Sequence, residues 1–144
     1  MSQATQSEFV SALLVGATPQ SRLIVLDVFR QAGWRLYEAR NRKGALGCLE
    51  RHPVQVVVTN AHFLGWPWKR ALQDLRRMPA PPQLVVTSHL ADDSLWAEVL
   101  NWGGYDVLAE PFERSEVERV IASARRHFNP PLARAGLAHV AAAS

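Results

Sequence analysis

The sequence predicts a three-layer α/β sandwich built on a five-stranded, doubly wound parallel sheet with strand order 2-1-3-4-5. Two observations lead to this prediction. Short apolar runs rich in β-branched residues alternate along the chain with amphipathic stretches. The runs also lack the polar alternation of strands that face water on one side. Five strand–helix units result, and right-handed crossovers place their strands in one parallel sheet.

The expected strands differ in the strength of their signal. Three are continuous apolar runs, at 12–15, 54–59 and 84–87, which are typical of strands covered by helices on both faces. Two weaker runs, at 34–38 and 105–109, complete the expected sheet.

Three helices are expected in the first part of the chain. The stretch 20–32 carries apolar residues on adjoining stripes and is followed by Gly33, a residue suited to a helix C-terminus. Asn41 is a good cap for a helix over 42–51. A third helix over 69–78 ends at the prolines that follow it.

Two more helices follow in the second part. Asp92 or Asp93 caps a helix that runs through Trp102, where a pair of glycines stops it. Ser115 and Glu118 form a capping-box pattern in front of the last apolar helical stretch.

The bulk composition indicates a single cytoplasmic domain that is not nucleic-acid binding. The one cysteine, Cys48, excludes an internal disulfide. No apolar run approaches the roughly 18 residues of a membrane span, and residues 1–9 lack the features of a signal peptide. The net charge is +3, but the basic residues form scattered pairs on expected helix surfaces, which argues against a nucleic-acid interface.

The domain is expected to occupy residues 1–128. The segment 129–144 changes in character, because Pro130-Pro131 breaks the last helix and an alanine-rich tail follows. A frayed extension, a short docking helix and the start of a linker all remain open for this tail.

Three stretches of the chain carry a resemblance to a known family. They are 56–60 (VVVTN), 82–88 (PQLVVTS) and 103–112 (GGYDVLAEPF). In this order and at this spacing they resemble the CheY-like receiver domain of response regulators, over roughly residues 11–128. The last stretch is similar to the family pattern Gly-Ala-x-Asp-Tyr-Leu-x-Lys-Pro-Phe. The resemblance implies the flavodoxin-like fold and a role in two-component signalling.

The resemblance also implies a site, from which this chain departs. The family's Mg²⁺-binding acidic pair maps to Gly16 and Ala17, and its phosphoacceptor aspartate maps to Asn60. The lysine that meets the phosphoryl oxygens maps to Glu110, and only the Ser/Thr position is retained, as Thr87. Phosphoryl transfer needs cationic stabilisation of an anionic group, and Mg²⁺ needs hard anionic oxygens. We therefore expect no catalytic residue, no metal and no cofactor.

Alternative interpretations remain for single residues. If the third strand slips by one position, Thr59 replaces Asn60 at the acceptor position, and neither is a carboxylate. Asn60 either mimics an unphosphorylated aspartate or serves as a turn residue, and the second interpretation is slightly favoured. His62 and His89 lie in loops near the carboxyl ends of the strands, but two histidines without a carboxylate or thiol partner are a poor ligand set for a metal.

Four tryptophans are candidates for an interaction surface. Trp66 and Trp68 share one loop after the third strand, where they either anchor a partner or close over the crevice. Trp96 and Trp102 lie six residues apart on one expected helix, so one is expected to face the core and the other outward. In the receiver family this helix, the fifth strand and the last helix form the common output and dimer face.

Three functions follow from these observations. The leading hypothesis is a receiver-like domain that binds a protein partner or itself without phosphorylation, and is not an enzyme. The second is a domain that binds a neutral or aromatic small molecule in the vacated crevice, for which the expected lining is Gly16, Ala17, Thr18, Asn60 and either Trp66 or Trp68. The third is a small enzyme, which ranks last because the sequence shows no glycine-rich phosphate loop and no nucleophile–base pair.

Overall fold

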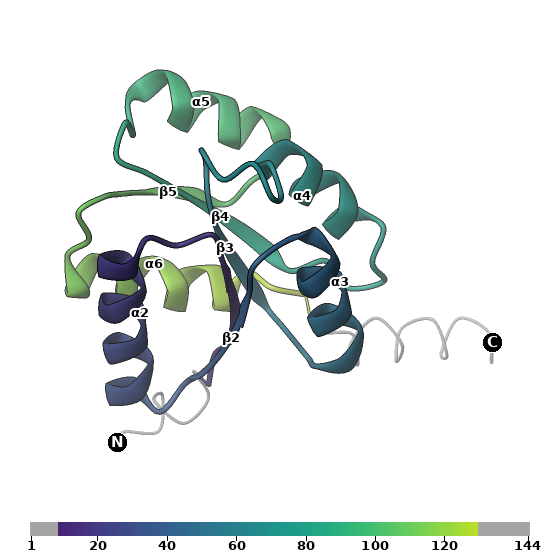
Figure 1. Ribbon diagram of the computed structural model, residues 1–144, viewed down its shortest axis with the longest axis horizontal. Coiled ribbons are helices and arrows are strands. Elements are labelled where there is room, and N and C mark those ends of the chain that lie inside the picture. Colours follow the sequence, from purple (N-terminus) through teal and green to yellow (C-terminus); the bar gives the residue numbers. More distant parts are fainter. Residues whose placement is uncertain (1–8, 130–144) are drawn as a thin grey trace.

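The chain folds as alternating strands and helices, as a computed structural model shows for residues 9–129 (Figure 1). The elements in chain order are β1 Ser11–Val15, α2 Pro19–Ala32, β2 Arg35–Ala39, α3 Arg42–Arg51, β3 Val56–Asn60, α4 Trp68–Arg76, β4 Gln83–Ser88, α5 Asp93–Trp102, β5 Asp106–Ala109 and α6 Arg114–Arg126. No helix among these is long and apolar enough to cross a membrane. The alanine-rich tail expected after Asn129 lies outside the described residues.

The five strands form one parallel sheet in the order β2-β1-β3-β4-β5, so the predicted fold class and topology are confirmed. Every residue of β1 and β3 is buried, and only the first residue of β4 is not. The edge strands β2 and β5 are largely half-buried or exposed. Continuous apolar runs thus mark the centre of the sheet, as helices on both faces require.

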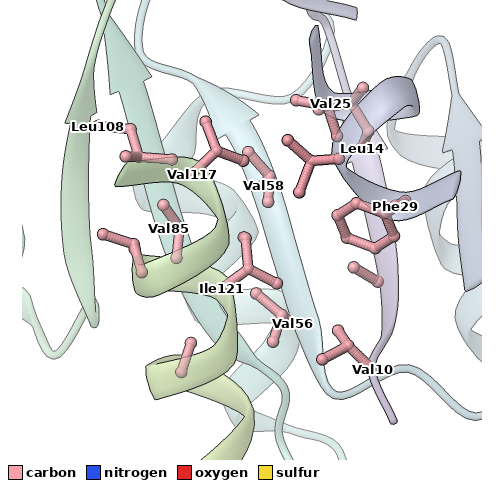
Figure 2. Packing of buried hydrophobic residues seen from close by; sticks show 14 of the residues in the cluster. Val10, Leu14, Val25, Phe29, Val56, Val58, Val85, Leu108, Val117 and Ile121 are labelled. Atoms are coloured by element: carbon pink, nitrogen blue, oxygen red, sulfur yellow. The ribbon is translucent and has the colours of Figure 1, made fainter. Parts of the chain in front are cut away.

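Two helix layers cover the sheet. On one face, α2 and α6 lie side by side and press Phe29, Val117 and Ile121 against strand residues such as Val58 and Val85 (Figure 2). The other face is covered by α3, α4 and α5, whose apolar side chains meet those of Leu13, Val57 and Val86. Because strand side chains alternate between faces, each central strand contributes to both cores.

Most predicted helix ends are confirmed, and one is wrong. The side chains of Asn41 and Asp92 accept hydrogen bonds from the backbone three residues later, and Gly33 ends α2 in the left-handed conformation. The capping box at Ser115 does not form: α6 begins at Arg114, after Glu113, and Ser115 lies inside the helix. The apolar pattern located that helix correctly, but its first turn extends further than the polar motif indicated.

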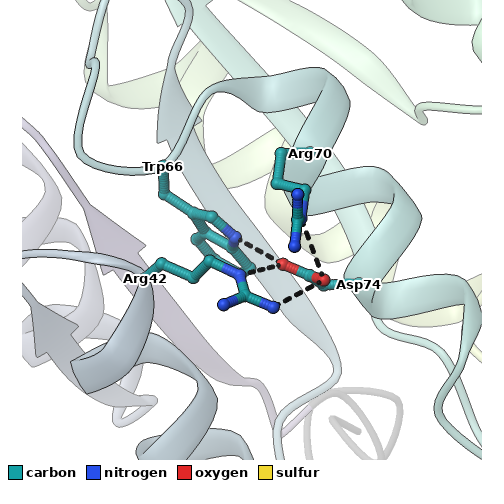
Figure 3. Close-up of polar contacts among 4 residues, drawn as sticks. All are labelled: Arg42, Trp66, Arg70 and Asp74. Atoms are coloured by element: carbon teal, nitrogen blue, oxygen red, sulfur yellow. Dashed lines mark hydrogen bonds and ion pairs between the residues drawn. The ribbon is translucent and has the colours of Figure 1, made fainter.

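Asp74 is a buried carboxylate on α4, in the core that α3, α4 and α5 form on their face of the sheet (Figure 3). Its oxygens accept hydrogen bonds from Arg42 Nε at 2.8 Å and from Trp66 Nε1 at 2.9 Å, and Arg70 forms an ion pair with it at 3.5 Å. The hydrogen bond from Arg42 lowers the pKa of the Asp74 carboxyl, although desolvation opposes this. One charged group therefore connects three segments: the start of α3, the loop between β3 and α4, and α4 itself.

Replacing Asp74 should destabilise the fold in a pH-dependent way. We expect Asp74→Ala to lower the free energy of unfolding by about 2–4 kcal/mol near pH 7, because it leaves the buried Trp66 N–H without an acceptor. Since the pKa of Asp74 is lowered in the folded state, its stabilisation is complete above the ordinary value of 3.8 and is lost as pH falls through the folded value. Urea denaturation of the wild type and Asp74→Ala, at pH 7 and at a pH below 3.8, measures the difference in their free energies of unfolding. The exposed Glu118→Ala variant is the control. A loss for Asp74→Ala no larger than that of the control would contradict this role.

Candidate functional site

The carboxyl ends of β1, β3, β4 and β5 meet at one edge of the sheet, as parallel pairing requires. A cleft of about 480 Å³ opens there, beside the first turn of α2 and the segment between β5 and α6. Its lining residues are Thr18, Gln20, Ser21, Ile24, Asn60, His62, His89, Glu110, Pro111 and Phe112. Two of the predicted site residues, Asn60 and Glu110, are therefore brought together.

Glu110 is the polar centre of this cleft. It follows β5 directly, before a cis peptide bond to Pro111, and is half-buried. One carboxylate oxygen accepts a hydrogen bond from Asn60 Nδ2 at 3.3 Å, and the other accepts a hydrogen bond from the Ser21 hydroxyl. The acidic side chain thus links the ends of β5 and β3 to the first turn of α2.

Asn60 acts as a turn residue, as the favoured interpretation expected. Its side-chain oxygen accepts a hydrogen bond from the backbone N–H of His62 at 2.7 Å, and its carbonyl accepts one from that of Phe63 at 3.2 Å. Its amide nitrogen is left to donate to Glu110. Of the two strand-3 alternatives, Asn60 lines the cleft, whereas Thr59 is buried and its hydroxyl has no hydrogen-bond partner among the described residues.

Gly16 and Ala17, the first two positions after β1, do not line this cleft. Gly16 and Ala17 line a second hollow of about 500 Å³, which they share with Arg22, Glu38 and the ring of Phe63, among others. Gly16 has a left-handed backbone, with φ of +71°, and a Cβ atom there would lie 2.4 Å from the Phe63 ring. The aromatic ring therefore occupies the space into which a side chain at position 16 would project.

The end of β4 places its two hydroxyl residues differently. Thr87 is buried, pairs with Asn60 across the sheet and does not line the cleft, consistent with a strand-end residue. The Ser88 hydroxyl instead contacts His62 Nε2 at 2.9 Å and accepts a hydrogen bond from the Leu90 N–H at 2.9 Å. Sequence reasoning missed the role of Ser21, because a serine in a first helical turn is indistinguishable from an ordinary capping residue.

Of the four candidate tryptophans, Trp66 and Trp68 fit neither interpretation offered for them, since both are buried and neither lines the cleft. Trp66 is fully buried and Trp68 nearly so, because the loop after β3 folds inward and delivers the Trp66 indole to Asp74. Neither is therefore available to a partner. Trp102 is half-buried against Trp68, with ring centroids 6.1 Å apart. Trp96, in contrast, has 49% of its surface exposed, so the prediction that one of this pair faces outward is confirmed.

Solved structures of receiver domains share this fold. The receiver domain of Francisella response regulator 1452 is 19% identical and superposes with a TM-score of 0.70, over 81% of this chain and 97% of that one. A response regulator from Thermotoga maritima is 16% identical, with a TM-score of 0.72 over 82% and 98%. The receiver domain of Saccharomyces cerevisiae Ssk1, bound to the histidine phosphotransfer protein Ypd1, is 14% identical, with a TM-score of 0.71 over 82% and 90%.

Sequence comparison adds nothing to this structural similarity. No protein-family model matches the chain, and no curated protein matches it in sequence. At the identities of the structural matches, the similarity establishes the receiver fold and leaves the function to be argued from the site.

The contact between Gly16 and Phe63 can be tested with a matched glycine. Gly33 also has a left-handed backbone, but no atom lies within 4 Å of a Cβ built on it. Gly33→Ala should therefore cost only the conformational penalty, about 1–2 kcal/mol, whereas Gly16→Ala should cost about 1–3 kcal/mol more because of overpacking against the ring. In a Phe63→Ala background the extra cost should disappear. Equal losses for both glycine variants in urea denaturation would show that Phe63 does not fill this space.

Proposed function

We propose that this chain is a receiver-like domain of a two-component-type cytoplasmic signalling protein, which acts by binding protein without being phosphorylated and is not an enzyme. The observation that carries the proposal is the Glu110 carboxylate, which accepts hydrogen bonds from Asn60 and Ser21 where the receiver resemblance expects a lysine beside an aspartate. The cleft lining contains neither lysine nor aspartate.

The Mg²⁺ that receiver chemistry uses does not fit the residues present. Mg²⁺ is held by hard oxygen ligands, usually with at least one or two carboxylates. Gly16 and Ala17 offer no side-chain oxygen, and Phe63 covers the first of them. The side-chain oxygen of Asn60 is engaged by a backbone N–H. Among residues 9–129, no group of three His, Cys, Asp or Glu side chains could hold a metal ion.

The same residues argue against a phosphoryl group. The neutral amide of Asn60 cannot form an acyl phosphate. Glu110, whose oxygen lies 3.3 Å from the Asn60 amide nitrogen, would place negative charge next to any phosphoryl oxygen there. Phosphoryl transfer depends on positive charge in this place, so the electrostatics oppose both the reaction and its product.

The surface that we propose for a protein partner or a second copy includes α5, β5 and α6. Trp96 on α5 is half-exposed, and its indole N–H donates to Asp106 at 3.2 Å. A shallow hollow of about 400 Å³ adjoins it, lined by Ala91, Asp92, Asp93, Trp96, Val107, Ala109 and Glu116. An exposed, orientated aromatic ring beside a hollow is typical of an interface anchor. The Ssk1 receiver is likewise seen with a protein partner, the phosphotransfer protein Ypd1.

A second candidate function is binding of a small molecule in the cleft. Its volume of about 480 Å³ lies in the range of ligand pockets. Part of the lining expected from the sequence is present, as Thr18 and Asn60, whereas Gly16, Ala17, Trp66 and Trp68 are not part of it.

The protein should not become phosphorylated by a small-molecule donor. Incubation with acetyl phosphate and Mg²⁺ should leave the intact mass unchanged, because the one carboxylate in the cleft lining, Glu110, is engaged by Ser21 and Asn60, and the lining contains no lysine or arginine to assist. A receiver domain with an intact aspartate serves as the positive control. A stable mass gain of one phosphoryl group, lost in Glu110→Gln or Asn60→Ala, would overturn the proposal.

Trp96 should matter for association and not for folding. We expect Trp96→Ala to weaken self-association by about tenfold or more, as for other aromatic anchors, while the urea midpoint stays unchanged. Leu23→Ala on α2, where the side chain is 63% exposed, is the control. Sedimentation of all three proteins over a range of concentrations measures the effect. Indistinguishable behaviour of wild type and Trp96→Ala would exclude Trp96 from a self-association surface.

A further inference from the structure

The cleft beside Glu110 combines one carboxylate with an apolar wall. Ile24 comes from α2, and Pro111 and Phe112 follow Glu110 in the chain. The first turn of α2 contributes Ser21, which is fixed by its backbone N–H on the Thr18 side chain at 3.3 Å. The result is a carboxylate held at a defined place, with an apolar wall on one part of the cleft and polar residues, among them Gln20, His62 and His89, on the rest.

The Glu110 carboxylate has hydrogen bonds but no counter-charge. Its two observed partners, the Ser21 hydroxyl and the Asn60 amide, are both neutral. Within residues 9–129, no Lys, Arg or His side chain forms an ion pair with it, although six ion pairs are formed elsewhere. A carboxylate has about four acceptor sites, so two stay available after these bonds. Because Glu110 is half-buried, its charge interacts more strongly with an opposite charge placed next to it than it would in bulk water.

We infer that this cleft binds a cationic group on an apolar stem, namely an alkylammonium or an alkylguanidinium. The cation would meet the remaining acceptor sites of Glu110, while the stem would lie against Ile24, Pro111 and Phe112. Ser21 and Asn60 would act as positioning residues, because they hold the carboxylate without neutralising it. The edge that binds an anion in receiver domains would then have the opposite charge preference.

Two sources can supply this chemistry: a free small amine, or a lysine or arginine side chain of a protein partner. The inference deepens the second proposed function by naming the ligand class, and it replaces the neutral or aromatic ligand expected from the sequence. It does not depend on the absence of phosphorylation, which the acetyl phosphate experiment decides separately.

An NMR titration tests the inference with defined probes. Butylammonium and butylguanidinium should each give saturable amide shifts at residues that line the cleft, with millimolar dissociation constants as befits ligands of so few atoms. Butanol, which has a similar stem and no charge, should give none. Glu110→Gln should weaken binding by about tenfold or more, because a charge-assisted hydrogen bond is lost. The glutamine retains a carbonyl that can accept from Ser21 and Asn60, so the fold should persist.

Glu113→Gln is the matched control, since Glu113 is exposed, lies three residues away and makes no side-chain cap hydrogen bond. It removes the same charge and should leave binding unchanged. Two further probes distinguish the sources. Binding of N-acetyl-arginine methylamide at least as tight as that of butylguanidinium assigns the site to a partner side chain, and its exclusion assigns the site to a free amine. No saturable shift with either butyl cation, or equal binding to Glu110→Gln, would overturn the inference.

Discussion

The three central strands β1, β3 and β4 are buried on both faces, and this constraint determines where polar groups of the chain can lie. A strand covered by helices on both sides disfavours polar side chains, because a buried polar group without a partner is costly. Polar residues that carry function must therefore come after the strands, at the edge where all their carboxyl ends meet. In this chain Asn60 and Ser88 end β3 and β4, and Glu110 follows β5; of these three, Asn60 and Glu110 line the cleft.

The charge at that edge decides what the site can do. A lysine would attract an anion, and Glu110 does the reverse. The carboxylate is held by Ser21 and Asn60, so the arrangement is internally satisfied by hydrogen bonds while remaining negative. On the neighbouring side, the Phe63 ring lies where a side chain after β1 would need to project. The negative charge of Glu110 and the packing of Phe63 thus both disfavour binding of a phosphoryl group with its Mg²⁺.

Much of the fold could be predicted from the sequence, because its signals are local. Continuous apolar runs marked β1, β3 and β4, and Asn41 and Asp92 marked helix starts by side-chain caps that the structure contains. The sequence also allowed the prediction that Asn60 and Glu110 lie at one edge of the sheet, because each stands at the carboxyl end of a predicted parallel strand. Contacts between distant residues were not predictable: the burial of Trp66 depends on Asp74 of the next helix, and the Ser21–Glu110 hydrogen bond joins residues 89 positions apart. The capping motif at Ser115 gave the wrong start for α6, because the helix begins at Arg114, two residues before the position that the motif indicates.

An amide NMR spectrum recorded with and without Mg²⁺ plus beryllofluoride, a phosphoryl mimic, is the most direct test of the central claim. The negative charge of Glu110 and the Phe63 ring over Gly16 predict no saturable shifts at Gly16, Asn60, Thr87 and Glu110. Saturable shifts at these four residues would contradict the claim, because they would show that the site accepts a phosphoryl group and its metal despite the carboxylate.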